Sequence, residues 1–280
     1  MMLELSRTVR FGLSPDEGDD QTPRDNTFSA WPAVRGLGRY YELHVACRGE
    51  ADPATGYFIN IKHIDTAVRE GVLPILRSAI GRDGRGGAGV AMGRLMREGF
   101  EALQPRLGGS VVRVGLQLAP TLELAVTREG LEVGDMGEVL VKQQYEFSAA
   151  HRLHVPGRSD AENRATFGKC NNPAGHGHNY RVEVTVRSPI DASGRTLDVA
   201  ALDAVVDARV IEKLDHKHLN HDVPEFAERN PSVEHIAQVV WGMLGPGLGG
   251  ALAGAELAEV AVWETGKTVC VYRGEGAASV

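Results

Sequence analysis

The stretch GKCNNPAGHGHNY, Gly168 to Tyr180, gathers side chains that could do chemistry. On a β-strand, residues two apart face the same side, so His176 and His178 can direct both imidazoles at one centre. His151 ends an earlier segment that reads as a strand, and it joins the pair if the two strands are neighbours. Three neutral imidazoles with one open position are the ligand set of catalytic zinc. The alternative is three unrelated histidines, each hydrogen-bonded in a core or exposed.

Cys170 precedes the His-x-His pair and is a candidate metal ligand or base. An isolated thiol titrates near about 8.5, and a nearby cation or metal lowers that value toward neutrality. Its polar neighbours, Lys and Asn residues followed by Pro, indicate a loop rather than a core. Cys47 and Cys270 lie within alternating strands and read instead as small buried residues.

Two carboxylates could assist this centre. Asp215 stands next to His216 in LDHKHLNHD, where it could orient and charge the imidazole. Glu264, in VWETGKT, is expected at a strand end, where its acceptor oxygens suit a planar ring that offers adjacent N–H donors. The alternative for both is an ordinary exposed side chain.

The composition places limits on the class of protein. The chain has 280 residues, 42% apolar and 24% charged, which is typical of globular proteins with one or two domains. It has neither a membrane-length apolar run nor the apolar core of a secretory signal. A net charge of −7 argues against broad nucleic-acid binding. Three widely spaced cysteines indicate a reducing cytoplasm rather than a disulfide framework.

The elements that position these residues occur twice. Three blocks of the first half resemble three blocks of the second half in the same order: TFSAWPAV and EFSAAHRL, GRYYELHVACRGEADPATG and GHNYRVEVTVRSPIDASG, YFINIKHIDTAV and RTLDVAALDAVV. The shared order favours a tandem duplication over chance similarity. The predicted domains are 1–135 and 136–280, joined near Gly134–Gly137.

Each copy follows one order of elements: a strand, a polar insertion, a hairpin with alternating apolar residues, two helices and a last pair of strands. In the second copy NPSVEHIAQVVWGML predicts a helix with Asn230 as its N-cap and Pro231 at its first position. The predicted class is α+β, with two tandem domains, each an antiparallel four-stranded sheet with two helices on one face.

The first copy lacks the residues that could do chemistry. Its matching positions hold Pro32 for His151, Leu37 for His176, Arg39 for His178 and Leu118 for Glu264. The scaffold is therefore expected to form without the histidines, which indicates that they serve one ligand rather than the fold.

FSAAHRL, FGKCNNPAGHGHNY, LDHKHLN and the ET before the last strand resemble the 6-pyruvoyl tetrahydropterin synthase family, which includes bacterial 6-carboxytetrahydropterin synthases of the queuosine pathway. The resemblance covers about Glu138 to Gly274, and the first half of the chain resembles the family only as a degenerate copy. It implies a tunnelling fold, in which such sheets close between subunits into a barrel. It also implies a homo-oligomer, either a trimer of fused chains or a higher assembly.

The resemblance also implies roles for individual residues. Zinc ligands would be His151, His176 and His178, and the general base would be Cys170, working with Asp215 and His216. The pterin would be anchored by Glu264, with Ser232, where relatives often have threonine, and Thr265 beside it.

The implied activity is that of a carbon–oxygen lyase acting on a small pterin triphosphate. Triphosphate leaves 7,8-dihydroneopterin triphosphate, and the side chain tautomerises to give 6-pyruvoyl tetrahydropterin. A 6-carboxy product is the alternative, and Cys170 argues against the branch that carries glutamate there and forms a hydroxymethylpterin. A zinc hydrolase and a non-catalytic pterin- or metal-binding protein are the more distant alternatives.

Overall fold

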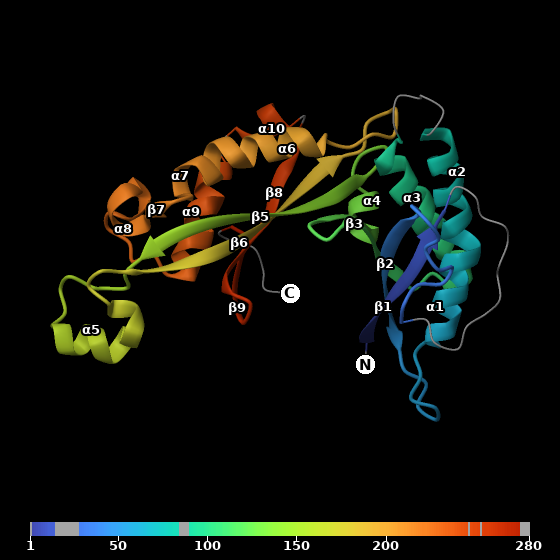
Figure 1. Ribbon diagram of the computed structural model, residues 1–280. Coiled ribbons are helices and arrows are strands. Elements are labelled where there is room, and N and C mark those ends of the chain that lie inside the picture. Colours follow the sequence, from blue (N-terminus) through green and yellow to red (C-terminus); the bar gives the residue numbers. More distant parts are fainter. Residues whose placement is uncertain (1, 15–27, 84–89, 246, 253, 275–280) are drawn as a thin grey trace. The chain divides into compact units, whose positions relative to one another are not determined.

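A computed structural model of the chain describes residues 2–14, 28–83, 90–245, 247–252 and 254–274 (Figure 1). Its contacts divide the chain into two compact units, Met1–Val141 with Ser188–Thr196, and Lys142–Arg187 with Leu197–Val280. Segment Ser188–Thr196 lies within the second predicted domain by sequence but packs with the first unit, where the Arg94 amide donates to the Gly194 carbonyl over 2.8 Å. Each unit combines a mainly antiparallel sheet with helices, so the α+β class is confirmed.

The first unit has four antiparallel strands in sequence order: β1 (Met2–Leu13), β2 (Arg39–Glu50), β3 (Val111–Ala119) and β4 (Leu122–Thr127). Its helices are α1 (Ile61–Ala67), which a π-helical turn (Val68–Val72) joins to α2 (Leu73–Asp83), and α3 (Met92–Leu103). The short α4 (Arg128–Leu131) follows β4. Figure 1 shows α1, α2 and α3 along one face of this sheet.

Alternation along the strands decides which face of the first sheet the helices cover. On β2 the apolar series Tyr41, Leu43, Val45 and Cys47 is buried, and on β1 Phe11 packs its ring against Tyr41 at 5.9 Å. Residues of this parity meet the buried side chains of the helices and form the core of the unit.

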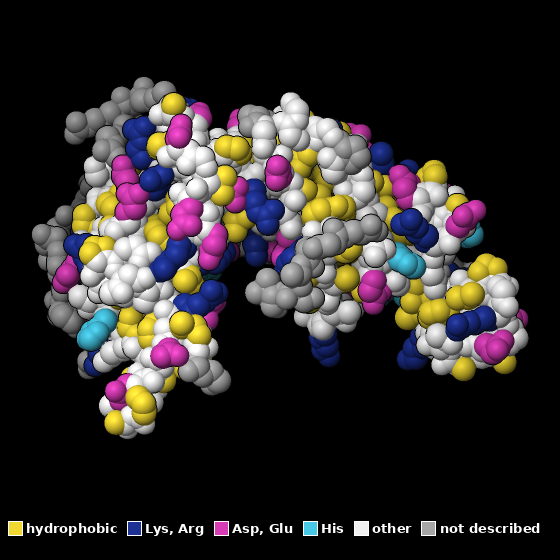
Figure 2. Space-filling model, turned by 180° about the vertical axis from the view of Figure 1, so that it is seen from behind, with side chains coloured by type: hydrophobic (Ala, Val, Ile, Leu, Met, Phe, Trp, Pro, Cys, Tyr) yellow, Lys and Arg dark blue, Asp and Glu magenta, His cyan; other side chains and the backbone are white. Residues whose placement is uncertain are grey.

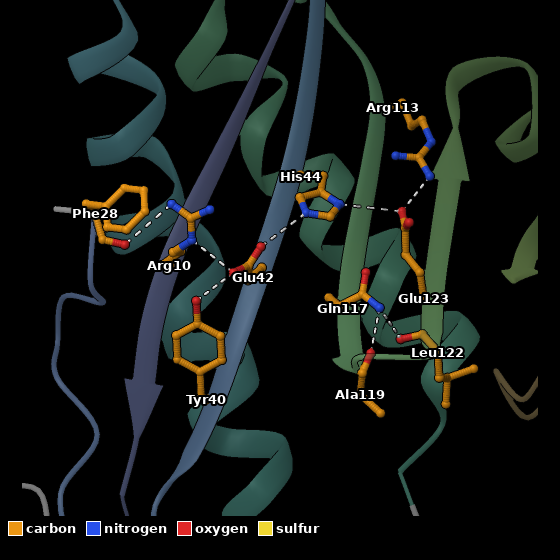
Figure 3. A network of polar contacts seen from close by, with 10 residues as sticks. All are labelled: Arg10, Phe28, Tyr40, Glu42, His44, Arg113, Gln117, Ala119, Leu122 and Glu123. Carbon is orange, nitrogen blue, oxygen red and sulfur yellow. Dashed lines mark hydrogen bonds and ion pairs between the residues drawn. The ribbon is translucent and has the colours of Figure 1, made fainter. Parts of the chain in front are cut away.

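The opposite face of the first sheet carries a network of charged side chains (Figure 3). Arg10 donates to Glu42, and His44 lies between two carboxylates, 3.7 Å from Glu42 and 3.8 Å from Glu123. Arg113 is the last member of this series of polar contacts. It donates to Glu123, which is only 8% exposed. Burial raises the pKa of Glu123, but the hydrogen bonds and charges of His44 and Arg113 outweigh it and lower that pKa to about 2.

We expect Glu123→Gln to reduce the free energy of unfolding by about 2–3 kcal/mol at neutral pH. The folded pKa of Glu123 lies below its ordinary value, so its contribution is present above about pH 4.5 and is lost as the pH falls toward 2. Urea denaturation at several pH values between 2 and 7 measures this. The variant should lose less stability on acidification than the unmodified chain, and an identical acid dependence would contradict the assignment.

The second unit has strands β5 (Glu138–His151), β6 (His176–Pro189), β8 (Glu256–Thr265) and β9 (Thr268–Tyr272), paired in that order, and the short β7 (Lys217–His218) pairs in parallel with β5. Helices α6 (Val199–Val206) and α7 (Glu212–Leu214) are joined by a second π-helical turn, Asp207–Ile211. The remaining helices are α5 (Asp160–Phe167), α8 (Leu219–Asp222), α9 (Val233–Leu244) and α10 (Leu248–Ala251).

Helix α9 supplies much of the core of the second unit. It buries Ile236, Val240 and Leu244, and it packs on β8 and β9. The predicted cap is two residues too early: the helix begins at Val233, and Ser232 is its N-cap, because the Ser232 side chain accepts from the His235 amide. Pro231 therefore lies outside the helix, and its carbonyl is free for another partner.

The two units share one pairing scheme within their first hairpins. Phe147 stacks on Tyr180 at 5.0 Å, as Phe11 meets Tyr41. The match of Pro32 to His151 is therefore wrong: the equivalent of Phe147 is Phe11, on β1. Pro32 follows β1 and lies beside it, where its carbonyl accepts from the Gly12 amide.

Among the described residues, every helix is too short or too polar to cross a bilayer. On the face drawn in Figure 2, Lys and Arg side chains are interspersed with Asp and Glu side chains rather than gathered into one patch.

Candidate metal centre

Strands β5 and β6 bring the three histidines to one face of the second sheet. Ser148 hydrogen bonds to Asn179 and Gln144 to Glu183 across the two strands, and this register sets His151 beside His176. The ring centroids lie 4.5 Å apart for His151 and His176, and 4.9 Å apart for His176 and His178. The strand alternation that predicted a common centre is the reason for this arrangement.

The turn before β6 depends on Gly175. Its φ of +72° is in the left-handed region, which side chains disfavour. A Cβ added there would lie 2.7 Å from His218 Nε2 and 3.1 Å from the carbonyl oxygen of His151. Only glycine therefore lets the chain pass this close to His151 as it enters β6.

We expect Gly175→Ala to cost about 1–2 kcal/mol of stability from the left-handed φ alone, and to weaken metal binding because His176 follows directly. Zinc titration and thermal unfolding measure the two effects. Gly177→Ala is a matched control, since a Cβ there meets its nearest atom at 3.6 Å and its φ is not positive. Equal metal affinity in both variants would contradict the role given to Gly175.

His151 is held from behind by the backbone. The ring is fully buried, and its Nδ1 donates to the carbonyl oxygen of Pro231 over 2.7 Å. A proton on Nδ1 leaves Nε2 as the atom with a free lone pair, and Nε2 points to the other histidines, 3.1 Å from His176 Nε2. This hydrogen bond fixes the tautomer that a metal requires.

A carboxylate completes the cluster. Glu264 Oε1 lies 3.1 Å from His151 Nε2 and 3.3 Å from His178 Nε2. One ligand atom from each of His151, His176, His178 and Glu264 lies within 4.8 Å of the other three. Glu264 was predicted to be a pterin anchor, and nothing in the residue pattern indicated that it meets the histidines.

The electrostatics keep these groups in the forms that bind metals. Burial, together with the neighbouring imidazoles, lowers the pKa of His176, and burial also lowers the pKa of His178. The contact with the His151 ring is the main cause that lowers the pKa of Glu264, and it acts as a hydrogen bond only when the ring carries a proton on Nε2 as well as on Nδ1. Neutral imidazoles and an ionised carboxylate are a donor set that zinc accepts, so the residues present fit this metal.

Cys170 lies in a 3₁₀ turn, Gly168–Asn171, and is neither fully buried nor fully exposed. Its carbonyl accepts from the Leu153 amide at 2.9 Å, which ties the turn to the segment after His151. Burial raises the pKa of Tyr180, and the charges of Glu264 and Cys170 raise it further. The Leu153 amide is two residues past His151, so its bond to the Cys170 carbonyl holds the turn of Cys170 beside the end of β5.

Asp215 and His216 form a dyad at a different place. Asp215 accepts from the Ser148 amide over 2.8 Å and from His216 Nδ1 over 2.7 Å, and the His216 side chain is 82% exposed. The Ser148 amide lowers the pKa of Asp215 most, and His216 adds to this. The dyad borders an open groove of about 490 Å³ over Ser148 and Asn179. Because these two side chains alternate with those of the histidines, the groove lies mainly over the opposite face of the hairpin, although His178 also lines it.

Ser232 and Thr265 have local partners. The Ser232 hydroxyl caps α9, as described above, and the Thr265 hydroxyl accepts from the Lys267 amide over 3.2 Å in the turn after β8. Nothing in these contacts assigns either residue to a ligand.

The carbonyl of Pro231 and the ring of Tyr180 are the parts of the centre that the sequence did not identify. Backbone groups leave no mark in residue identity, so the hydrogen bond from His151 to Pro231 could not be predicted. Tyr180 ends the GHGHNY motif, and the parity that it shares with His178 is the signal in the sequence that could have identified it.

The comparisons with known proteins fall on this half of the chain. Residues 140–275 match the family model described as 6-pyruvoyl tetrahydropterin synthase. The chain is 44% identical over 130 residues to a 6-pyruvoyl tetrahydrobiopterin synthase of Poecilia reticulata, a match that covers 46% of this chain and 86% of the relative. The corresponding human protein is 43% identical over 136 residues, covering 48% of this chain and 91% of the relative.

A solved structure of Caenorhabditis elegans 6-pyruvoyl tetrahydropterin synthase is also similar. Its sequence identity to this chain is 35% and the TM-score is 0.46. The match covers 51% of this chain and 100% of that one.

Proposed function

Because the chain belongs to the 6-pyruvoyl tetrahydropterin synthase family, we propose that it converts 7,8-dihydroneopterin triphosphate to 6-pyruvoyl tetrahydropterin with loss of triphosphate. The observation that carries the proposal is the meeting of His151, His176 and His178 within the residues that match the family. The reaction is a carbon–oxygen lyase reaction. Hydrogen removed from the side chain is returned to the ring, so no redox cofactor is needed.

We assign His151, His176 and His178 as the metal ligands, and we assign zinc as the metal. These residues would hold a zinc ion that would supply Lewis acidity to oxygens of the substrate side chain and so make the adjacent C–H protons more acidic. The Cys170 thiolate removes one of these protons, and His216, held and charged by Asp215, returns a proton elsewhere. The Glu264 carboxylate accepts from the ring N–H groups and sets the side chain at the reacting centre, with Ser232 and Thr265 beside the ring.

The dyad is bonded to the Ser148 backbone at the edge of β5, and His216 borders a groove that lies mainly over the face opposite the histidine cluster. A site that combined Cys170 with His216 would then take the dyad from a second domain. We propose that such sites form between subunits of a barrel-shaped homo-oligomer, a trimer of fused chains or higher. Domain 1–135, which lacks metal ligands, would act as a fused neighbour to the catalytic domain 136–280. Mass measurement in solution tests this, and a stable monomer would contradict it.

Incubation with dihydroneopterin triphosphate and zinc tests the function. We expect release of triphosphate and a pterin product with the mass of 6-pyruvoyl tetrahydropterin. A 6-carboxy product would move the chain to the alternative branch, and hydrolysis of esters or amides without triphosphate release would indicate a zinc hydrolase. Binding without turnover would leave a pterin- or metal-binding protein.

We place the protein in the cytoplasm. All three cysteines are free thiols, with Cys47 buried and the other two partly exposed, which fits a reducing compartment.

A further inference from the structure

A pocket of about 320 Å³ lies beside the segment that follows β5. Arg152 and His154 of that segment line it, together with Pro173 and with residues 226–230, which precede α9. Among the residues that the structure describes, none lines both this pocket and the groove beside the Asp215–His216 dyad, and no member of the metal cluster lines the pocket. The proposed function so far leaves this pocket without a role.

The charged groups of the pocket favour an anion. Two guanidinium groups line it, those of Arg152 and Arg229, and Glu228 is the one carboxylate among the described lining residues. Within the described part of the chain, the Arg229 side chain and the two terminal nitrogens of Arg152 have no hydrogen-bond partner. Two cations against one carboxylate make the pocket locally positive, although the chain as a whole has a net charge of −7.

Two neutral side chains that line the pocket add hydrogen-bond donors. The Asn171 amide nitrogen donates to the Leu153 carbonyl over 2.7 Å and to His154 Nδ1 over 3.1 Å, so a neutral His154 ring carries its proton on Nε2. Asn230 Oδ1 accepts from the His154 amide over 3.0 Å, which makes its other amide atom, Nδ2, a donor. Donors of this kind beside two guanidinium groups suit the oxygens of a phosphate chain.

The wall of the pocket is bonded to the turn that holds Cys170. Arg152 Nε donates to the Asn171 carbonyl over 3.3 Å, and the Leu153 amide donates to the Cys170 carbonyl over 2.9 Å. Arg152 also follows the metal ligand His151 directly in the sequence. The pocket is therefore bordered by a segment that connects the end of β5 to the turn of the proposed base.

We propose that this pocket binds an oligophosphate, with Arg152 and Arg229 as its cationic contacts. This first statement concerns the pocket alone. A second statement rests on the proposed function: the oligophosphate is the triphosphate of the substrate, which is the polyanionic part of that molecule and leaves during the reaction. The triphosphate chain of a free nucleotide has the same chemistry, so the experiment has to separate the two sources.

Calorimetric titration of the metal-free full-length protein with inorganic triphosphate tests the first statement. We expect Arg229→Gln to weaken binding at least about 10-fold, since a charge-assisted hydrogen bond is lost. Glu228→Gln should strengthen binding about 2–5-fold, because a carboxylate that repels the anion is removed. Arg164→Gln is the matched control, because Arg164 is exposed on α5 and does not line the pocket. Absence of binding, or a loss in Arg229→Gln no larger than in Arg164→Gln, would overturn the proposal.

Three further measurements complete the test. All three variants should melt at the temperature of the unmodified chain, because the substituted side chains are exposed. Titration with ATP separates the sources, and ATP that binds more tightly than inorganic triphosphate would assign the pocket to a nucleotide and overturn the second statement. In the lyase assay, Arg229→Gln should raise KM by about the factor by which triphosphate binding weakens, and an unchanged KM would also overturn the second statement. An unmodified protein without lyase activity would contradict the proposed function and leave the triphosphate titration unaffected.

Discussion

Cys170→Ala is expected to lower the turnover of dihydroneopterin triphosphate by at least about 1,000-fold while metal binding stays intact. A positioned base contributes typically 10²–10⁴-fold to a proton transfer, and alanine leaves no group in its place. Cys170 is outside the metal cluster, in a 3₁₀ turn whose carbonyl accepts from the Leu153 amide. The loss should therefore appear in kcat and not in metal affinity.

Triphosphate release measured at saturating substrate, with zinc content measured on the same sample, checks this result. Cys270→Ala is the matched control, because Cys270 is also a partly exposed free thiol of the second unit but lies on β9. Turnover that persists in Cys170→Ala at the level of Cys270→Ala would remove Cys170 from the base role.

His178→Ala is expected to have the largest effect on the metal. Loss of one imidazole from the set should weaken zinc binding by about 100-fold or more and remove activity at low zinc. His178 is a better position for this variant than His151. The His151 ring is fully buried and donates to the Pro231 carbonyl, so its removal would also leave that carbonyl without its hydrogen bond.

Isothermal titration with zinc measures the change, and thermal unfolding of the metal-free protein shows that the fold is retained. His63→Ala serves as control, since His63 is an exposed histidine of the first unit, outside the cluster. Zinc affinity within a factor of three of the unmodified chain in His178→Ala would exclude this residue as a ligand.

The histidine cluster could be predicted because its geometry is local. Alternation within β6 aligns His176 with His178, and a single strand pairing adds His151. The period of two is read directly from residue order, and the pairing of β5 with β6 is the one tertiary assumption that His151 required.

The remaining parts of the centre depend on distant or backbone contacts. Glu264 reaches the histidines from another strand through a bulge, and neither feature is encoded in its neighbours. The cap of α9 was misplaced by two residues because Asn230, Pro231 and Ser232 all suit a helix start, and only tertiary contacts decide among them. The match of Pro32 to His151 was wrong because the segment of similar sequence around Pro32 lies beside β1 and is not part of that strand.

The bond between His151 and the Pro231 carbonyl has a thermodynamic consequence. Pro231 lies just before the first turn of α9, and His151 ends β5. The hydrogen bond from the imidazole therefore connects the end of a strand to the start of a helix. A metal ion bound to Nε2 would also strengthen the hydrogen bond from Nδ1 to the Pro231 carbonyl. By thermodynamic linkage, part of the free energy of metal binding would then stabilise the contact between β5 and the start of α9. Metal loading should therefore slow amide hydrogen exchange in the first turn of α9, far along the chain from the ligands themselves.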